Sequence, residues 1–128
     1  MISNNYNEWV WNRRMKDHFP ESMKKDIVEL YDGCFDYSCY REYDEIMVFV
    51  TKCFIERNKQ LDQKATIVQV KMKFGILTIY YQGKYDPYLD EIINTATKMA
   101  AGVSRKIERL YGKGGPWNRK ILQPAKSK

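Results

Sequence analysis

The last third of the chain concentrates the side chains best suited to holding an anionic partner. Residues 98–128 contain nine Lys or Arg residues and one acid, Glu108, so their formal charge is +8, whereas residues 1–97 sum to −2 and the whole chain to +6. Cations bind phosphates, and aromatic rings stack on bases or nucleotide rings. The sequence therefore indicates a candidate binding set of nine residues: Lys98, Arg105, Lys106, Arg109, Tyr111, Lys113, Trp117, Arg119 and Lys120.

A basic segment of this composition also suits roles that involve no phosphate. Trp, Tyr and Arg dominate protein–protein hot spots, so the same residues would suit a protein partner. The dipole of a helix favours cations in its last turns, which gives Arg105, Lys106 and Arg109 a purely structural reason to be there. A solvated helix face followed by a basic tail would have the same composition.

A second group of side chains could carry acid–base or magnesium chemistry. Glu42 and Glu45 would share one face of a helix, and paired carboxylates can perform such chemistry. Acids at the first turn of a helix more often reflect the helix dipole. The only histidine, His18, lies in no recognisable nucleophile motif. We expect no enzyme, and keep a small enzyme as the third alternative, using the acids Asp32, Asp36, Glu42, Asp44 and Glu45.

The three cysteines give no support to a metal or cofactor site. Cys34 and Cys39 are too isolated to form a zinc site, because no second pair of ligands follows them. An odd number of cysteines and a polar amino terminus predict reduced thiols in a cytoplasmic protein. We expect Cys53 to lie in the core, Cys34 and Cys39 to lie in or beside a loop, and no cofactor to be bound.

Helical patterns dominate the first half of the chain. Residues 5–18 are predicted to be helical with an apolar face of Tyr6, Trp9, Val10 and Met15, and Trp11 falls off that face. A second helix follows Pro20 and ends before Gly33. Residues 42–59 are apolar on most sides, which is typical of a central core helix.

The clearest strand pattern follows this helix. Residues 65–72 alternate, with one face made of Thr66, Val68, Val70 and Met72, and residues 76–82 are rich in β-branched and aromatic types. The short gap contains Gly75, which predicts a β-hairpin. Two strands alone are marginal, so the hairpin must pack on helices or gain a third strand from the N-terminal part or the tail.

The strongest helix pattern lies at residues 87–111. Asp86 can cap its first amides, Pro87 suits its first position, and Gly112 ends it. Its apolar stripe recurs at steps of three and four: Leu89, Ile92, Ile93, Ala96, Met99, Ala100, Val103, Ile107 and Leu110. Arg105 and Arg109 would share one face, with Lys98 two turns earlier and Lys106 beside them.

These elements together predict a fold of the α+β class. We expect one small domain over residues 1–112, in which a β-hairpin or small antiparallel sheet packs against two long helices and the N-terminal region is helical. Residues 113–128 would form a basic C-terminal tail. No apolar run is long enough to span a bilayer, so we expect no membrane partner.

The hairpin segment resembles a known family. Val-Lys-Met-Lys-Phe-Gly-Ile-Leu-Thr-Ile-Tyr at residues 70–80 is similar to the Val-Lys-x-Lys-Phe-Gly-x-Leu-x-Phe-Tyr signature of small bacteriophage and prophage proteins of unknown function. Gly-Cys-Phe-Asp at residues 33–36 is similar to the family's Gly-Trp-(Phe/Tyr)-Asp. Glu108 and Tyr111 stand where the family has two cysteines, so the resemblance implies no thiolate metal site. It covers about residues 33–115 and implies a phage-like origin.

Composition and resemblance together favour a binding function. We expect a non-enzymatic phage or prophage type of protein that binds a host macromolecule, in takeover or counter-defence. The alternative is a protein that binds nucleic acid or a nucleotide through the basic C-terminal helix end and tail. The sequence does not decide between a host protein and a nucleic acid as the partner, and it does not indicate an oligomeric state.

Overall fold

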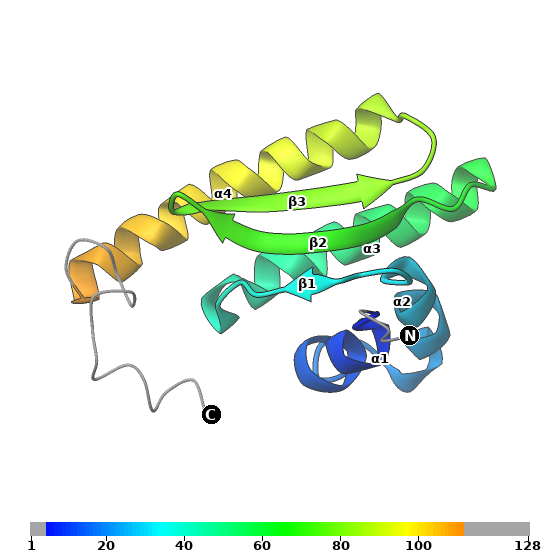
Figure 1. The fold of residues 1–128 in the computed structure, drawn as a ribbon, viewed down its shortest axis with the longest axis horizontal. Helices are drawn as coiled ribbons and strands as arrows, with labels where there is room; N and C mark the ends of the chain where they lie inside the picture. The colour runs from blue at the N-terminus through cyan, green and yellow to red at the C-terminus, as the bar shows by residue number, and fades with distance from the viewer. Residues whose placement is uncertain (1–4, 112–128) are drawn as a thin grey trace.

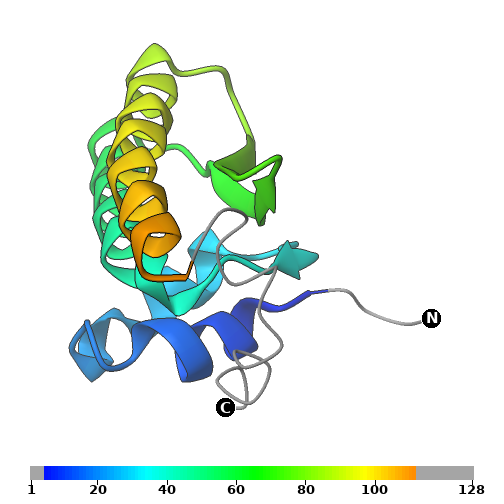
Figure 2. The ribbon, with the colours of Figure 1, turned by 90° about the vertical axis from the view of Figure 1, so that its left-hand side faces the viewer.

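Two long helices cover one face of a three-stranded β-sheet in the computed structural model, which describes residues 5–111 (Figure 1, Figure 2). The predicted α+β class is confirmed. None of the helices in this described range combines the length and apolar character needed to cross a bilayer. In chain order the elements are α1 (Asn7–Val10), the π-helix η1 (Trp11–Met15), the 3₁₀-helix η2 (Glu21–Met23), α2 (Lys24–Leu30), β1 (Asp36–Tyr37), the 3₁₀-helix η3 (Arg41–Tyr43), α3 (Asp44–Leu61), β2 (Thr66–Lys73), β3 (Ile76–Gln82) and α4 (Pro87–Tyr111).

The N-terminal helical region buries only part of the predicted apolar face. Val10, Trp11 and Met15 are buried, whereas Tyr6 and Trp9 are about two-fifths exposed. The buried stripe also contains Arg14, a charged residue that a count of apolar positions overlooks. A π-helical turn, closed by the Lys16 amide on the Trp11 carbonyl at 2.9 Å, widens the helix here and changes which side chains share a face.

Helix α3 is the central helix, as predicted. It buries Ile46, Met47, Val50 and Phe54, and it packs against α4, α2 and η1. The cysteine prediction was only partly right: Cys34 and Cys39 do lie in the loops flanking β1, but they are buried, and Cys53 on α3 is half-buried.

The predicted hairpin is confirmed as β2 and β3. Its two turn residues, Phe74 and Gly75, have φ values of 53° and 79°, and Lys73 pairs with Ile76 across the turn. Positive φ at both positions is the signature of a type I′ hairpin turn. The third strand, β1, does come from the N-terminal part, but it runs parallel to β2, so the sheet is mixed and not purely antiparallel.

The predicted alternation along β2 holds for Val70 and Met72, which pair with the inward-facing Ile79 and Leu77, but it fails earlier in the strand because the strand contains a bulge. Ile67 pairs with Tyr81 and Gln69 pairs with Tyr80, which leaves Val68 as an extra residue. The extra residue shifts the alternation of inward-facing and outward-facing side chains by one position. Ile67 and Val70 are therefore both completely buried, although they are three residues apart. From Gln69 onward, alternate residues of β2 face away from the helices.

Helix α4 begins as predicted and extends beyond the sheet at its other end. The Tyr88 amide donates to the Asp86 carboxylate at 3.0 Å, which caps the helix. Leu89, Ala96 and Ala100 are buried in the shared core. The last turns extend past the hairpin (Figure 1), and Leu110 of the predicted apolar stripe is 65% exposed there. Met99, another residue of that stripe, is 43% exposed beside the buried Ala100.

Candidate macromolecule-binding site

The outer face of α4 carries a line of exposed cations. Lys98, Arg105 and Arg109 are separated by seven and four residues and therefore lie within about 20° of one line along the helix. All three are exposed, and Lys106 is exposed beside them. We call Lys98, Arg105 and Arg109 the α4 stripe. It lies opposite the residues that α4 buries, such as Ala96 and Ala100.

The α4 stripe keeps its charge available. None of its three cations, nor Lys106, forms an ion pair with another residue between positions 5 and 111. Gly102 lies in the gap between Lys98 and Arg105, and a β-carbon there would meet only the Arg105 guanidinium, at 3.8 Å. The backbone is thus uncovered at this point, and a ligand can approach it closely between the cations.

Only part of the predicted binding set falls in the described structure. Lys98, Arg105, Lys106 and Arg109 are all exposed in the second half of α4, and Lys98, Arg105 and Arg109 share one line along it, as the helical spacing predicts. The Tyr111 side chain and the whole of Lys113, Trp117, Arg119 and Lys120 lie outside the described residues. Whether those rings and cations join the stripe therefore stays a prediction.

Two polar contacts hold α4 in place at its start. The Arg57 guanidinium forms two hydrogen bonds with the Asp86 carboxylate, at 2.9 and 3.1 Å, and Gln63 donates a third at 3.1 Å. These donors, Arg57 first, lower the pKa of Asp86 to about 2, so the carboxylate that caps α4 is ionised at neutral pH. Arg57 also lies over the Tyr88 ring, at 4.7 Å from its centre.

A third contact holds α4 near the stripe. The Tyr43 hydroxyl is 2.8 Å from the Ser104 hydroxyl, and Tyr43 itself is almost fully buried. This contact links η3 to the helix turn that precedes Arg105. Together with the buried apolar face of α4, it helps to hold the helix in the orientation that exposes the α4 stripe.

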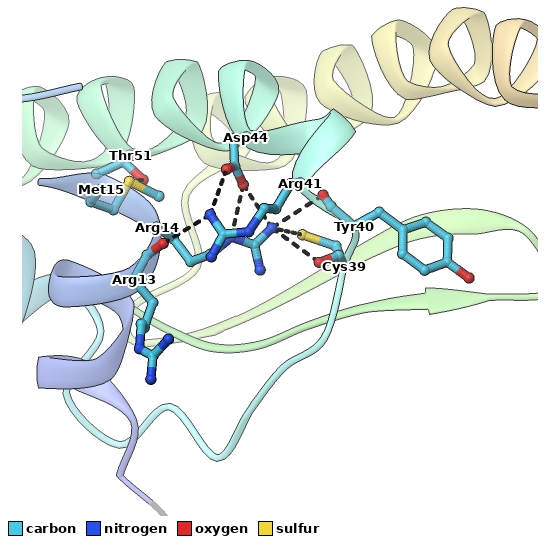
Figure 3. Close-up of polar contacts among 8 residues, drawn as sticks. All are labelled: Arg13, Arg14, Met15, Cys39, Tyr40, Arg41, Asp44 and Thr51. Atoms are coloured by element: carbon cyan, nitrogen blue, oxygen red, sulfur yellow. Dashed lines mark hydrogen bonds and ion pairs between the residues drawn. The ribbon is translucent and has the colours of Figure 1, made fainter. Parts of the chain in front are cut away.

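A buried polar cluster around Arg14 was missed by sequence reasoning. The Arg14 Nε donates to Asp44 at 2.8 Å, and its Nη2 donates to the carbonyls of Cys39 and Tyr40 at 3.0 and 3.1 Å (Figure 3). The guanidinium also lies 4.8 Å from the centre of the Tyr37 ring. Only 6% of Arg14 is exposed. This cluster joins η1, the segment after β1 and the start of α3, and its burial suits a structural role.

The acidic cluster does not assemble as a catalytic site. Asp44 is bound by Arg14, Asp36 accepts a hydrogen bond from Gln69 at 3.1 Å, and Glu42 and Glu45 are exposed. Within residues 5–111, no three His, Cys, Asp or Glu side chains lie close enough together to hold a metal ion. The described carboxylates of the acidic cluster are therefore engaged separately or exposed to solvent.

The buried thiols are also poor nucleophiles. Burial raises the pKa of Cys34 and of Cys39 to about 11 each, so both stay protonated at neutral pH. A thiol reacts as its thiolate, and an apolar environment disfavours that form. The geometry therefore offers no activated cysteine at these two positions.

A shallow groove of about 510 Å³ runs between α2, the end of α3 and the start of β2. Its side chains are mixed in charge and partly paired already, since the Lys59 amine lies 3.0 Å from the Asp26 carboxylate. Asn58 is used by the backbone of Ala65, to which it both donates and accepts. The groove lacks the convergent polar groups that mark a small-molecule site.

Comparisons with known proteins add no assignment. No protein-family model matches the chain, no curated protein matches it, and no solved structure matches it.

Proposed function

We propose that this chain is a non-enzymatic binding protein of the phage or prophage type that acts by binding a macromolecule of its host. The outer face of α4 makes the contact. Nucleic acid is the partner that this face suits best, with a role in takeover or counter-defence. The phage-like origin is supported by the resemblance of the hairpin segment and of residues 33–36.

The observation that carries the proposal is that the α4 stripe forms no ion pair within residues 5–111. Lys98 and Arg109 are eleven residues apart, which corresponds to about 16 Å along the helix axis. A DNA duplex carries one negative charge per roughly 1.7 Å of its axis, so several phosphates fall within that length. Arginine binds phosphate with two hydrogen bonds, and these cations need not give up an ion pair to any residue between positions 5 and 111 to do so.

One helix face is sufficient to bind nucleic acid when the contacts are made to its phosphates. Phosphate contacts position a protein on nucleic acid without reading its sequence. A row of cations on a rigid helix supplies such contacts at fixed spacing, and the Tyr43–Ser104 contact holds the direction of that row. We infer binding with little sequence preference and strong dependence on salt.

The test removes the three charges of the α4 stripe and compares the result with an equal loss of charge elsewhere. The variant Lys98→Gln, Arg105→Gln, Arg109→Gln keeps residues that favour helix. The control Lys16→Gln, Lys25→Gln, Lys52→Gln removes three exposed cations that belong to other segments than α4 and form no ion pair within residues 5–111. Fluorescence anisotropy with a labelled oligonucleotide should show at least tenfold weaker binding for the stripe variant, and a much smaller change for the control. Equal weakening in both variants would mean that only net charge matters.

A host protein is the second candidate partner. Met99 and Leu110 are large apolar side chains that stay exposed on the same part of α4, and apolar side chains next to arginines are typical of protein interfaces. The variant Met99→Gln, Leu110→Gln distinguishes the two partners. If nucleic acid is the partner, this variant should bind the oligonucleotide with unchanged affinity. If a host protein is the partner, the variant should capture less of one defined protein from host lysate.

A further inference from the structure

The β2–β3 hairpin has an outer face with a composition unlike that of the rest of the sheet. Its inner positions, such as Val70, Leu77 and Ile79, are buried against the helices. The positions between them face outward: Lys71 pairs with Thr78 and Lys73 with Ile76. Neither view of the fold places a helix of the described chain over this side of the hairpin (Figure 1, Figure 2). We call Lys71, Lys73, Phe74, Ile76 and Tyr80 the hairpin surface.

Three large apolar or aromatic side chains of the hairpin surface are exposed. Phe74 is 93% exposed at the turn, Ile76 is 54% exposed and Tyr80 is 43% exposed. Alternate residues on one strand are about 6.8 Å apart, so Ile76 and Tyr80 lie about 14 Å apart along β3. Phe74 at the turn and Tyr80 farther along β3 thus place one aromatic ring at each end of the hairpin surface.

The charge of the hairpin surface is positive. Lys71 and Lys73 form no ion pair with any residue that the structure describes. The nearest acid in the strand register is Asp36, opposite Gln69, and its carboxylate accepts the hydrogen bond from that glutamine. Cations in a row beside exposed rings complement a phosphate backbone with accessible bases.

Phe74 is an unfavourable residue for the turn itself. It has φ of 53°, a left-handed conformation that Asn, Asp and Gly adopt more easily than a bulky side chain. Its ring makes no aromatic contact with another described residue, and it is almost wholly in solvent. The side chain therefore does little for folding, and its chemistry is that of a contact residue.

We propose that the hairpin surface binds single-stranded nucleic acid, with Phe74 and Tyr80 stacking on bases and with Lys71 and Lys73 holding phosphates. This inference rests on the proposed function, since it specifies which form of nucleic acid is the ligand. Bases in a duplex are stacked on each other and are closed to protein rings, whereas those of a single strand are open to them. The hairpin surface and the α4 stripe are on different elements, so separate variants test them.

The test uses Phe74→Asn in the full-length chain. Asn-Gly is the preferred type I′ turn, so this variant should unfold at the same temperature as the wild type or at a higher one. The probe is a labelled mixed-sequence strand of about 15 nucleotides, used as single-stranded DNA, as RNA of the same sequence and as a duplex. The matched control is Tyr85→Asn, which removes a ring that is 72% exposed in the connection between β3 and α4.

The expected result is a loss that depends on the form of the ligand. Phe74→Asn should weaken single-strand binding about tenfold, which matches the loss of one stacked base, and should change duplex binding less than twofold. Tyr80→Thr should do the same, and Tyr85→Asn should change neither. A preference for DNA or for RNA agrees equally with the proposal.

Three outcomes would overturn one proposal or both. Unchanged single-strand affinity in Phe74→Asn, with binding lost only in the α4 stripe variant, would reject the hairpin surface and keep the proposed function. Loss of binding in Phe74→Asn alone would keep the hairpin surface and reject the α4 stripe. Absence of any oligonucleotide binding by the wild type, even at low salt, would reject both.

Discussion

Removing the buried Arg14 should destabilise the fold far more than removing an exposed cation. Arg14→Met would leave the Asp44 carboxylate without its closest partner, and it would remove the hydrogen bonds that Arg14 donates to the buried Cys39 carbonyl and to the partly buried Tyr40 carbonyl. Breaking a buried ion pair on one side typically costs about 3–5 kcal/mol. A domain of this kind has about 5–15 kcal/mol of stability in total. We therefore expect the variant to lose a large part of its free energy of unfolding.

Urea unfolding followed by circular dichroism measures this loss, with the slope against urea showing whether the transition stays two-state. The control is Lys59→Met, because the bridge from Lys59 to Asp26 is similarly short, at 3.0 Å, but its lysine is largely exposed. That variant should lose only about 0–1 kcal/mol. A second change, Asp44→Leu, made together with Arg14→Met should restore part of the loss by removing the unpaired carboxylate. An Arg14→Met variant as stable as the control would refute the buried cluster.

Single contacts in the fold lead to three further predictions. Tyr37→Phe should be neutral or should stabilise the fold by up to about 1 kcal/mol, because the Tyr37 hydroxyl is buried without a hydrogen-bond partner in residues 5–111. Tyr31→Phe should cost about 1–2 kcal/mol in the same urea titration, because it removes the 2.8 Å hydrogen bond between Tyr31 and the buried Thr51. Gly102→Ala should raise stability by about 0.5–1 kcal/mol, since its β-carbon meets only one flexible side chain, and a lower melting temperature would contradict this. The pKa of Asp86 is lowered to about 2 in the folded protein, so the ionised carboxylate stabilises the fold above the unfolded pKa of about 4, and this stabilisation is lost as the pH falls towards 2. Between about pH 5 and pH 2 the melting temperature of Asp86→Asn should therefore fall less steeply than that of the wild type.

The elements that the sequence predicts well are those with local signals. The start of α4 is encoded by a cap at Asp86 followed by Pro87, and the hairpin turn by Gly75 between two strand-like segments. The exposure of Lys98, Arg105 and Arg109 follows from their position opposite the apolar stripe. Helical periodicity is enough to place all three on one line.

The features that sequence reasoning missed depend on contacts between distant segments. The bulge at Val68 and the π-helical turn that begins at Trp11 shift which residues are buried. Neither has a recognisable sequence pattern. Arg14 and Asp44 are thirty residues apart, and each belongs to a charge pattern that would normally be exposed. The parallel pairing of β1 arises from only two residues, too few for any strand pattern.

The salt dependence of oligonucleotide binding tests the central claim most directly. Affinity is measured by anisotropy at several salt concentrations for the wild type, for the α4 stripe variant and for its charge-matched control. In the wild type we expect log affinity to fall steeply and linearly with log salt concentration. In the stripe variant the magnitude of this slope should be smaller by about two to three, because each of the three lost phosphate contacts reduces the slope by about 0.7–0.9. A stripe variant whose slope equals that of the control would contradict the assignment of α4 as the binding face.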